Sequence, residues 1–128
     1  MGKYVYRRSV VGEAGLETIR VMRPLLRRLE ARDEALAQQL LRALTNVVMA
    51  VGRAELPEPR NVRGHILNAV GSANEARALL QMAVDWRYCS WRSVKRTHTH
   101  LELTTRRLRD LAKQKRPRLT RVPSSRAS

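Results

Sequence analysis

The sequence predicts an all-α protein, an antiparallel up-down-up-down four-helix bundle. Apolar residues recur at steps of three and four along most of the chain, which is the spacing of one face of an α-helix. No alternation of apolar and polar residues, the pattern of a β-strand, competes with this spacing. The chain of 128 residues has the size of a single domain. Four amphipathic helices of about 20 residues each bury their apolar faces most simply as a bundle.

The first two helices are expected to begin at Glu13 and directly after Asp33. Pro24 interrupts the apolar run of the first helix and predicts either a kink or a later helix start. Asp33 is a suitable N-cap because its carboxylate can accept hydrogen bonds from the amides of the first turn. Apolar residues occupy most of the circumference of the second helix, so we expect it to be buried on more than one side. These residues are Leu36, Leu40, Leu41, Ala43, Leu44, Val47, Val48, Ala50 and Val51.

The prolines of segment 55–60 disfavour helix and predict an extended connection to the second half of the bundle. Asn61 is expected to cap a third helix, in which the small residues at 71–73 permit close approach of a neighbour. The fourth helix is expected from about Ser90. Its inner side is predicted to contain Trp91, Val94, His98, Leu101, Thr105 and Leu108. The predicted organisation is a basic N-terminal arm over 1–12, the bundle over 13–114 and a flexible basic tail over 115–128.

Positive charge is concentrated in the last third of the chain. The protein has 26 basic and 11 acidic residues and a net charge of +15, of which +11 lies in residues 87–128. Guanidinium groups match phosphate geometry and stay charged at every relevant pH. We therefore expect a polyanion, RNA or an RNA–DNA hybrid, as the partner, with an acidic protein as the alternative. The candidate nucleic-acid-binding residues are Arg92, Lys95, Arg96, Arg106, Arg107, Arg109, Lys113, Lys115, Arg116 and Arg118.

Three aromatic residues, Trp86, Tyr88 and Trp91, surround the turn between the third and fourth helices. They either stack on exposed bases or close the end of the bundle, and the second role is favoured because indole rings bury a large apolar area. Glu75 stands among alanines on the third helix. We expect it to form a structural ion pair, with Arg42 as the candidate partner, or to face a channel in an oligomer.

No arrangement typical of an enzyme, a metal site or a cofactor site is recognisable in the sequence. His98 and His100 are two residues apart and point to opposite sides of a helix, unlike metal-ligand pairs. Cys89 has no evident base partner, which predicts a passive thiol. We therefore expect no catalysis, no metal and no cofactor. The chain lacks a run of about 18 apolar residues and a secretory signal, which predicts a cytoplasmic protein without a membrane partner.

Two stretches resemble a known family of small four-helix-bundle proteins. Residues 39–46, Gln-Leu-Leu-Arg-Ala-Leu-Thr-Asn, are similar to the family's Q-L-R-R-A-A-x-S stretch. Residues 69–76, Ala-Val-Gly-Ser-Ala-Asn-Glu-Ala, are similar to its A-x-G-S-x-x-E segment. One branch of this family is encoded in intervening sequences of bacterial large-subunit ribosomal RNA genes. Another is the accessory variability determinant of diversity-generating retroelements, the partner of their reverse transcriptase.

One departure from the family pattern distinguishes the two branches. Many members of the ribosomal branch end the second helix with Asn-Ile-Ala-Glu-Gly, whereas residues 50–54 here read Ala-Val-Gly-Arg-Ala. Arg53 at the acidic position favours the strongly basic retroelement branch. The resemblance, which extends over residues 13–112, implies a homopentameric barrel of bundles without catalytic activity. It also implies binding to structured RNA or to a reverse transcriptase.

Overall fold

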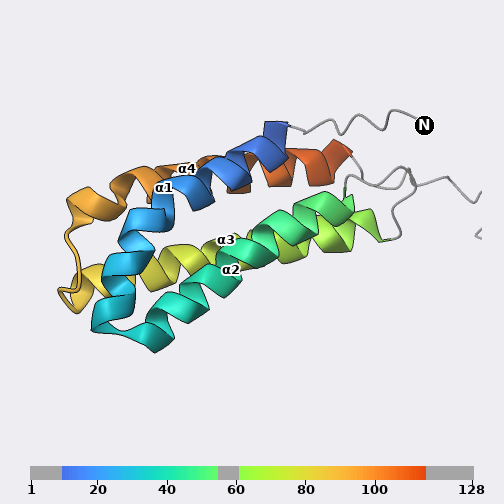
Figure 1. Ribbon diagram of the computed structural model, residues 1–128. Coiled ribbons are helices and arrows are strands. Elements are labelled where there is room, and N and C mark those ends of the chain that lie inside the picture. The colour runs from blue at the N-terminus through green and yellow to red at the C-terminus, as the bar shows by residue number, and fades with distance from the viewer. Residues whose placement is uncertain (1–9, 55–60, 115–128) are drawn as a thin grey trace, which may run out of the picture.

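The computed structural model describes residues 10–54 and 61–114, and every regular element within these ranges is a helix. The helices are α1 (Val10–Arg32), α2 (Glu34–Ala54), α3 (Val62–Asp85) and α4 (Trp91–Gln114). Each helix packs on the one before it, and α4 also packs on α1. Figure 1 shows α1 beside α4 on one side of the bundle and α2 beside α3 on the other. The predicted four-helix bundle is confirmed. The predicted 55–60 connection and 115–128 tail, with most of the 1–12 arm, lie outside the described ranges.

Pro24 bends α1 without ending it. The helix begins at Val10, three residues before the predicted start at Glu13, and continues through Pro24 to Arg32. Figure 1 shows α1 changing direction part-way along its length. Proline removes one backbone hydrogen bond and crowds the preceding turn, which is a common cause of such a bend. Beyond the bend, the last turns of α1 lead into α2 through Asp33.

Asp33, between α1 and α2, connects this junction to the turn between α3 and α4. Its Oδ1 accepts a hydrogen bond from the backbone N–H of Leu36 at 3.0 Å, which confirms the predicted N-cap of α2. Its Oδ2 accepts a hydrogen bond from the Tyr88 hydroxyl at 3.2 Å. Desolvation, and after it this bond to Asp33, raise the pKa of Tyr88 above its ordinary value. One carboxylate thus ties the α1–α2 junction to the α3–α4 turn.

Asn61 begins α3 in a different way from the one predicted. Its backbone is left-handed, with φ of 51°, and its side chain makes no capping hydrogen bond. Its carbonyl oxygen instead accepts a hydrogen bond from the N–H of His65 at 3.1 Å. Asparagine adopts left-handed backbone more readily than most residues. The prediction of a side-chain cap is therefore wrong, and Asn61 acts through its backbone conformation.

The core contains side chains from all four helices. Its largest fully buried members include Met22, Leu29, Leu40, Leu44, Ile66, Leu80, Leu101 and Leu108. α2 packs on both α1 and α3 and is thus buried on more than one side, as predicted, but part of its apolar circumference stays open, because Leu41 is 46% exposed and Val48 is half-buried. Gly71 on α3 is exposed, with open space around it, so it does not serve close packing within this chain. Surplus apolar surface therefore remains on the outside of α2 and α3.

α4 buries Val94, Leu101, Thr105 and Leu108 as predicted, but it buries Thr97 and Thr104 in place of Trp91 and His98. Thr97, Thr104 and Thr105 are buried, whereas Trp91 is exposed and His98 is half-buried. The buried hydroxyls of Thr104 and Thr105 donate to the carbonyl oxygens of His100 and Leu101, each at 2.8 Å. Because these hydroxyls are hydrogen-bonded within the helix, burying them leaves no unpaired donor.

A search of the described helices finds none that is both long and apolar enough to cross a membrane.

Candidate nucleic-acid interface

The cations predicted on α4 lie on its outer surface. Their exposed members are Arg92, Lys95, Arg96, Arg106, Arg109 and Lys113, and Arg107 is half-buried. The opposite side of the helix is buried against the bundle through residues such as Val94, Leu101 and Leu108. This is the arrangement that the sequence predicts. The remaining candidates, Lys115, Arg116 and Arg118, lie outside the described residues.

The positive charge of α4 is not neutralised by neighbouring acids. Within residues 10–54 and 61–114, none of the seven α4 cations forms an ion pair. α4 has two acidic residues, Glu102 and Asp110. Glu102 Oε2 lies 3.6 Å from Nη2 of Arg77 on α3, so its charge is balanced by another helix. The outer surface of α4 therefore keeps most of its positive charge for a partner.

α1 extends this basic surface, a contribution that sequence reasoning missed. Its five arginines, Arg20, Arg23, Arg27, Arg28 and Arg32, are all exposed, and α1 packs beside α4. Only Arg20 is paired with an acid of its own helix, with its Nη1 3.4 Å from Oε2 of Glu17. The sequence carried a signal for part of this surface, because Arg20, Arg23 and Arg27 recur at three- and four-residue steps opposite Met22, Leu25 and Leu29.

The bundle has one strongly basic side and one nearly neutral side. α1 and α4 together contain twelve basic and five acidic residues, a net charge of +7. α2 and α3 contain four basic and three acidic residues, a net charge of +1. We call the two sides the basic layer (α1 and α4) and the neutral layer (α2 and α3). A polyanion approaching this molecule meets attractive potential on the basic layer.

An open hollow lies where the end of α4 meets the beginning of α3. It has a volume of about 280 Å³ and is lined by Arg63, Leu67, Arg109, Ala112 and Lys113. Three cations from two helices thus surround one concave surface. The exposed lining of the hollow is mostly apolar, so the three cations add to the basic surface around it, and the hollow itself is not a phosphate site.

The two tryptophans of the α3–α4 turn do not close the end of the bundle. Trp86 is 60% exposed and Trp91 is 43% exposed, whereas Tyr88 is half-buried. Trp86 lies edge-on to Tyr88 with ring centroids 5.9 Å apart, and Trp91 lies edge-on to His98 at 5.2 Å. The favoured prediction, that the two indoles close the bundle end, is therefore wrong. Tyr88, in contrast, packs against the core at this end of the bundle.

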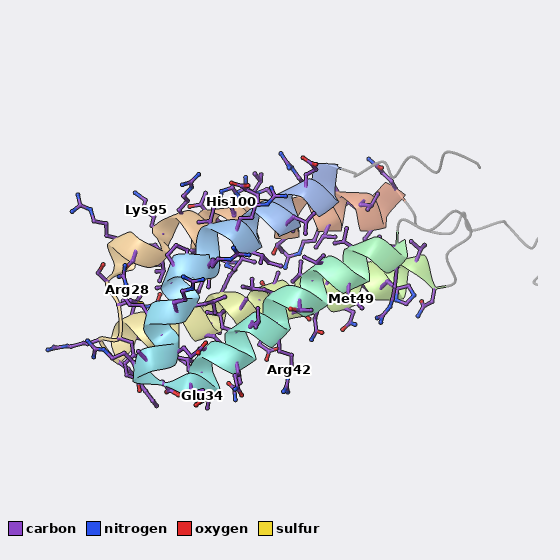
Figure 2. All side chains as sticks on the ribbon, viewed as in Figure 1. Arg28, Glu34, Arg42, Met49, Lys95 and His100 are labelled. Atoms are coloured by element: carbon purple, nitrogen blue, oxygen red, sulfur yellow. The ribbon has the colours of Figure 1, made fainter. Side chains whose placement is uncertain are left out.

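The predicted pairing of Arg42 with Glu75 is not formed. Both side chains are exposed, and neither forms an ion pair within the described part of the chain. Figure 2 shows Arg42 projecting outward from α2. The helical rotation that buries the leucines of α2 and the alanines of α3 turns both charged groups to the exterior. The cation that does hold an acid across helices is Arg77, whose partner is Glu102.

The histidines and the cysteine do not assemble into a reactive site in the described residues. His98 packs on Trp91, and no group of three His, Cys, Asp or Glu side chains suited to a metal ion occurs there. Burial raises the pKa of the Cys89 thiol, and the nearby Arg28 only partly opposes this shift. A thiol with a raised pKa is a poor nucleophile at neutral pH.

Comparison with known proteins identifies a structural relative. No protein-family model and no curated protein matches the sequence. A solved structure from Bacteroides thetaiotaomicron, described as a protein of unknown function from the S23 ribosomal protein family, superposes with a TM-score of 0.72. The two proteins share a fold. The match covers 81% of this chain and 99% of the other at 20% sequence identity. Function therefore has to be argued from the surface chemistry of this chain.

Proposed function

We propose that this protein is a non-enzymatic nucleic-acid-binding protein that binds RNA, or an RNA–DNA hybrid, through its basic layer. The observation that carries the proposal is the set of α4 cations that face solvent without acidic partners in the described residues. Gathering like charges on one surface is unfavourable in the free protein, and a polyanion relieves that repulsion. The arginines of α1, and Arg63 at the start of α3 beside Arg109 and Lys113, widen the same surface.

The experiment that tests this proposal is a salt titration of RNA binding by the full-length protein. Bound phosphates release condensed counterions, so affinity should fall linearly with salt on a double-logarithmic plot. For about four phosphate contacts, raising the salt from about 50 to about 200 mM should weaken binding roughly 50-fold. Fluorescence anisotropy of a labelled RNA measures this. Affinity that is absent, or insensitive to salt, contradicts the proposal and leaves an acidic protein as the better partner.

The neutral layer supports a second element of the proposal, self-association. Its large exposed apolar residues are Leu41 at 46%, Met49 at 52%, Leu67 at 46% and Met82 at 41% exposure. Figure 2 shows Met49 on the outer side of α2. Gly52 and Gly71 have open space where a side chain would stand, so another helix could approach closely there. The family resemblance implies five copies, each an antiparallel up-down-up-down bundle, and the observed order of helix neighbours supports that topology.

Self-association predicts that charge on the neutral layer separates the copies. Replacing Met49 and Leu67 with glutamate should reduce the particle mass measured by light scattering at micromolar concentration. Helicity should not change, because both side chains are already exposed. The matched control is the same substitution at Leu103 on the basic layer, which is 38% exposed. A wild-type protein that scatters light as a single chain contradicts this element but not RNA binding.

The biological role that we propose is that of accessory protein to a reverse transcriptase in a diversity-generating retroelement. Its support is the family resemblance, the high net charge and Arg53, which is exposed on α2. The second candidate is association with ribosomal RNA, which the S23 family of the structural relative favours. Sequencing the RNA that co-purifies at low salt separates the two. A retroelement template transcript supports the first role, and large-subunit ribosomal RNA supports the second.

A further inference from the structure

We propose that Trp86 and Trp91, at the turn between α3 and α4, form a stacking site for unpaired nucleobases. The inference rests on the proposed function, because the phosphates bound along α4 would bring a strand to this turn. It adds the class of nucleic acid: single-stranded or looped segments, whose bases are free to stack, in preference to continuous duplex.

The first observation is the exposure of both indoles. At 60% and 43%, they leave large apolar surfaces in water, although indoles are mostly buried in folded proteins. Both ring contacts are edge-to-face, with interplanar angles of 76° to Tyr88 and 64° to His98. In an edge-to-face pair, each ring keeps at least one of its faces free of the other ring. Each indole therefore has a face available for stacking.

The second observation is that the turn holds these rings on a fixed backbone. The N–H of Arg87 donates to the carbonyl of Val84, and that of Tyr88 donates to Ala83, each at 2.9 Å. These two bonds form a Schellman motif, which usually places glycine where Arg87 stands with φ of 63°. The Tyr88 hydroxyl anchors the same turn to Asp33. A platform that is already ordered loses little entropy when a base stacks on it.

The third observation is the positive charge around the turn. Arg87 and Arg92 are exposed on either side of it. Arg28 and Arg32 of α1 are close enough to act electrostatically on Cys89 and Tyr88, respectively. Figure 2 shows Arg28 and Lys95 at this end of the bundle. The nearby acids are engaged, since Asp33 accepts from Leu36 and Tyr88, and Asp85 accepts from Gln81 at 2.9 Å. Aromatic faces flanked by unpaired cations are how proteins bind single strands.

The test uses tryptophan fluorescence, because Trp86 and Trp91 are the two tryptophans of the chain. Three probes are compared at low salt: a single-stranded RNA of mixed sequence, the duplex of the same RNA, and inorganic polyphosphate. The single strand should quench the fluorescence strongly, whereas the duplex and polyphosphate should compete for the basic layer with little quenching. Salt-dependent binding of all three probes without selective quenching by the single strand overturns the stacking site and leaves the proposed function intact. Absence of salt-dependent binding overturns both.

Substitutions of the two tryptophans test whether the indoles cause the preference for single-stranded RNA. Trp86→Leu and Trp91→Leu should each weaken binding of the single strand by about fivefold or more and leave polyphosphate binding unchanged. Leu103→Ala, which removes an exposed apolar side chain from α4 away from the turn, is the matched control and should change neither affinity. An equal loss for both probes, or no loss for the single strand, overturns the proposal. If a leucine variant fails to fold by circular dichroism, the wild-type quenching comparison still decides.

Discussion

Replacing Arg106 and Lys113 with glutamine should weaken RNA binding about 15- to 30-fold at about 0.15 M salt. The reason is that RNA binding then releases fewer condensed counterions for each cation removed. The slope of the double-logarithmic salt plot should become shallower by about 1.4 to 1.8 for the two charges. Both residues are exposed on α4 and unpaired within the described residues, so the fold should not change. Arg107 is left in place because it is half-buried and its aliphatic stem contributes to packing.

The matched control for this prediction is Arg42 and Arg53 replaced together with glutamine. These arginines are also exposed, and they lie on α2 in the neutral layer. The net charge changes by the same amount, so a long-range effect of total charge would weaken both variants alike. We expect the control to lose less than about threefold, because charges beyond about 10 Å are largely screened at this salt concentration. Equal losses would mean that RNA binding depends on the total charge of the protein and not on the basic layer, and would contradict the proposed interface.

Replacing Asp33 with alanine should destabilise the protein by about 2 kcal/mol. The loss of an N-cap costs about 1 kcal/mol, and the loss of the bond from the Tyr88 hydroxyl costs about the same. The two bonds belong to different carboxylate oxygens, at 3.0 Å and 3.2 Å. Chemical denaturation with urea, followed by circular dichroism, measures the free energy of unfolding.

Two further variants separate the contributions of Asp33. Asp33→Asn keeps an oxygen that can cap α2 and should recover at least half of the lost stability. Tyr88→Phe removes only the bond across the bundle end and should cost about 1 kcal/mol or less. If Asp33→Ala costs no more than Tyr88→Phe, the cap contributes nothing and the account of the α1–α2 junction is wrong.

Local features of this fold could be predicted from the sequence, whereas those that depend on helix rotation could not. Asp33 was identifiable as a cap because capping involves only the next few residues of the chain. Trp91 and His98 fit the apolar period of α4, yet the buried arc is centred near Leu101 and Leu108 and extends to Thr97 and Thr104 on the side away from Trp91 and His98. Periodicity gives the angle between side chains around a helix. The edges of the buried arc are set by the neighbouring helices.

In the candidate interface too, some features could be predicted from the sequence and others depended on how the helices pack. The α4 cations could be predicted because most of the charge imbalance lies in the last third of the sequence. The arginines of α1 were missed because counting charge along the chain ignores the return of α4 to the side of α1. Arg42 and Glu75 were paired on residue type alone, and their positions on the outer surfaces of α2 and α3 keep them apart. Tertiary packing sets the distance between these two side chains, and the identities of two residues far apart in the sequence do not reveal that distance.

The unequal charge of the two layers makes the free molecule an electric dipole. In the field of a phosphodiester strand, such a molecule rotates so that α1 and α4 lead before any atoms touch. A larger fraction of collisions is then productive, and the association rate constant should exceed that of a protein of equal charge spread evenly. Dissolved ions shorten the reach of this orienting field, so the rate advantage should fade as the Debye length contracts.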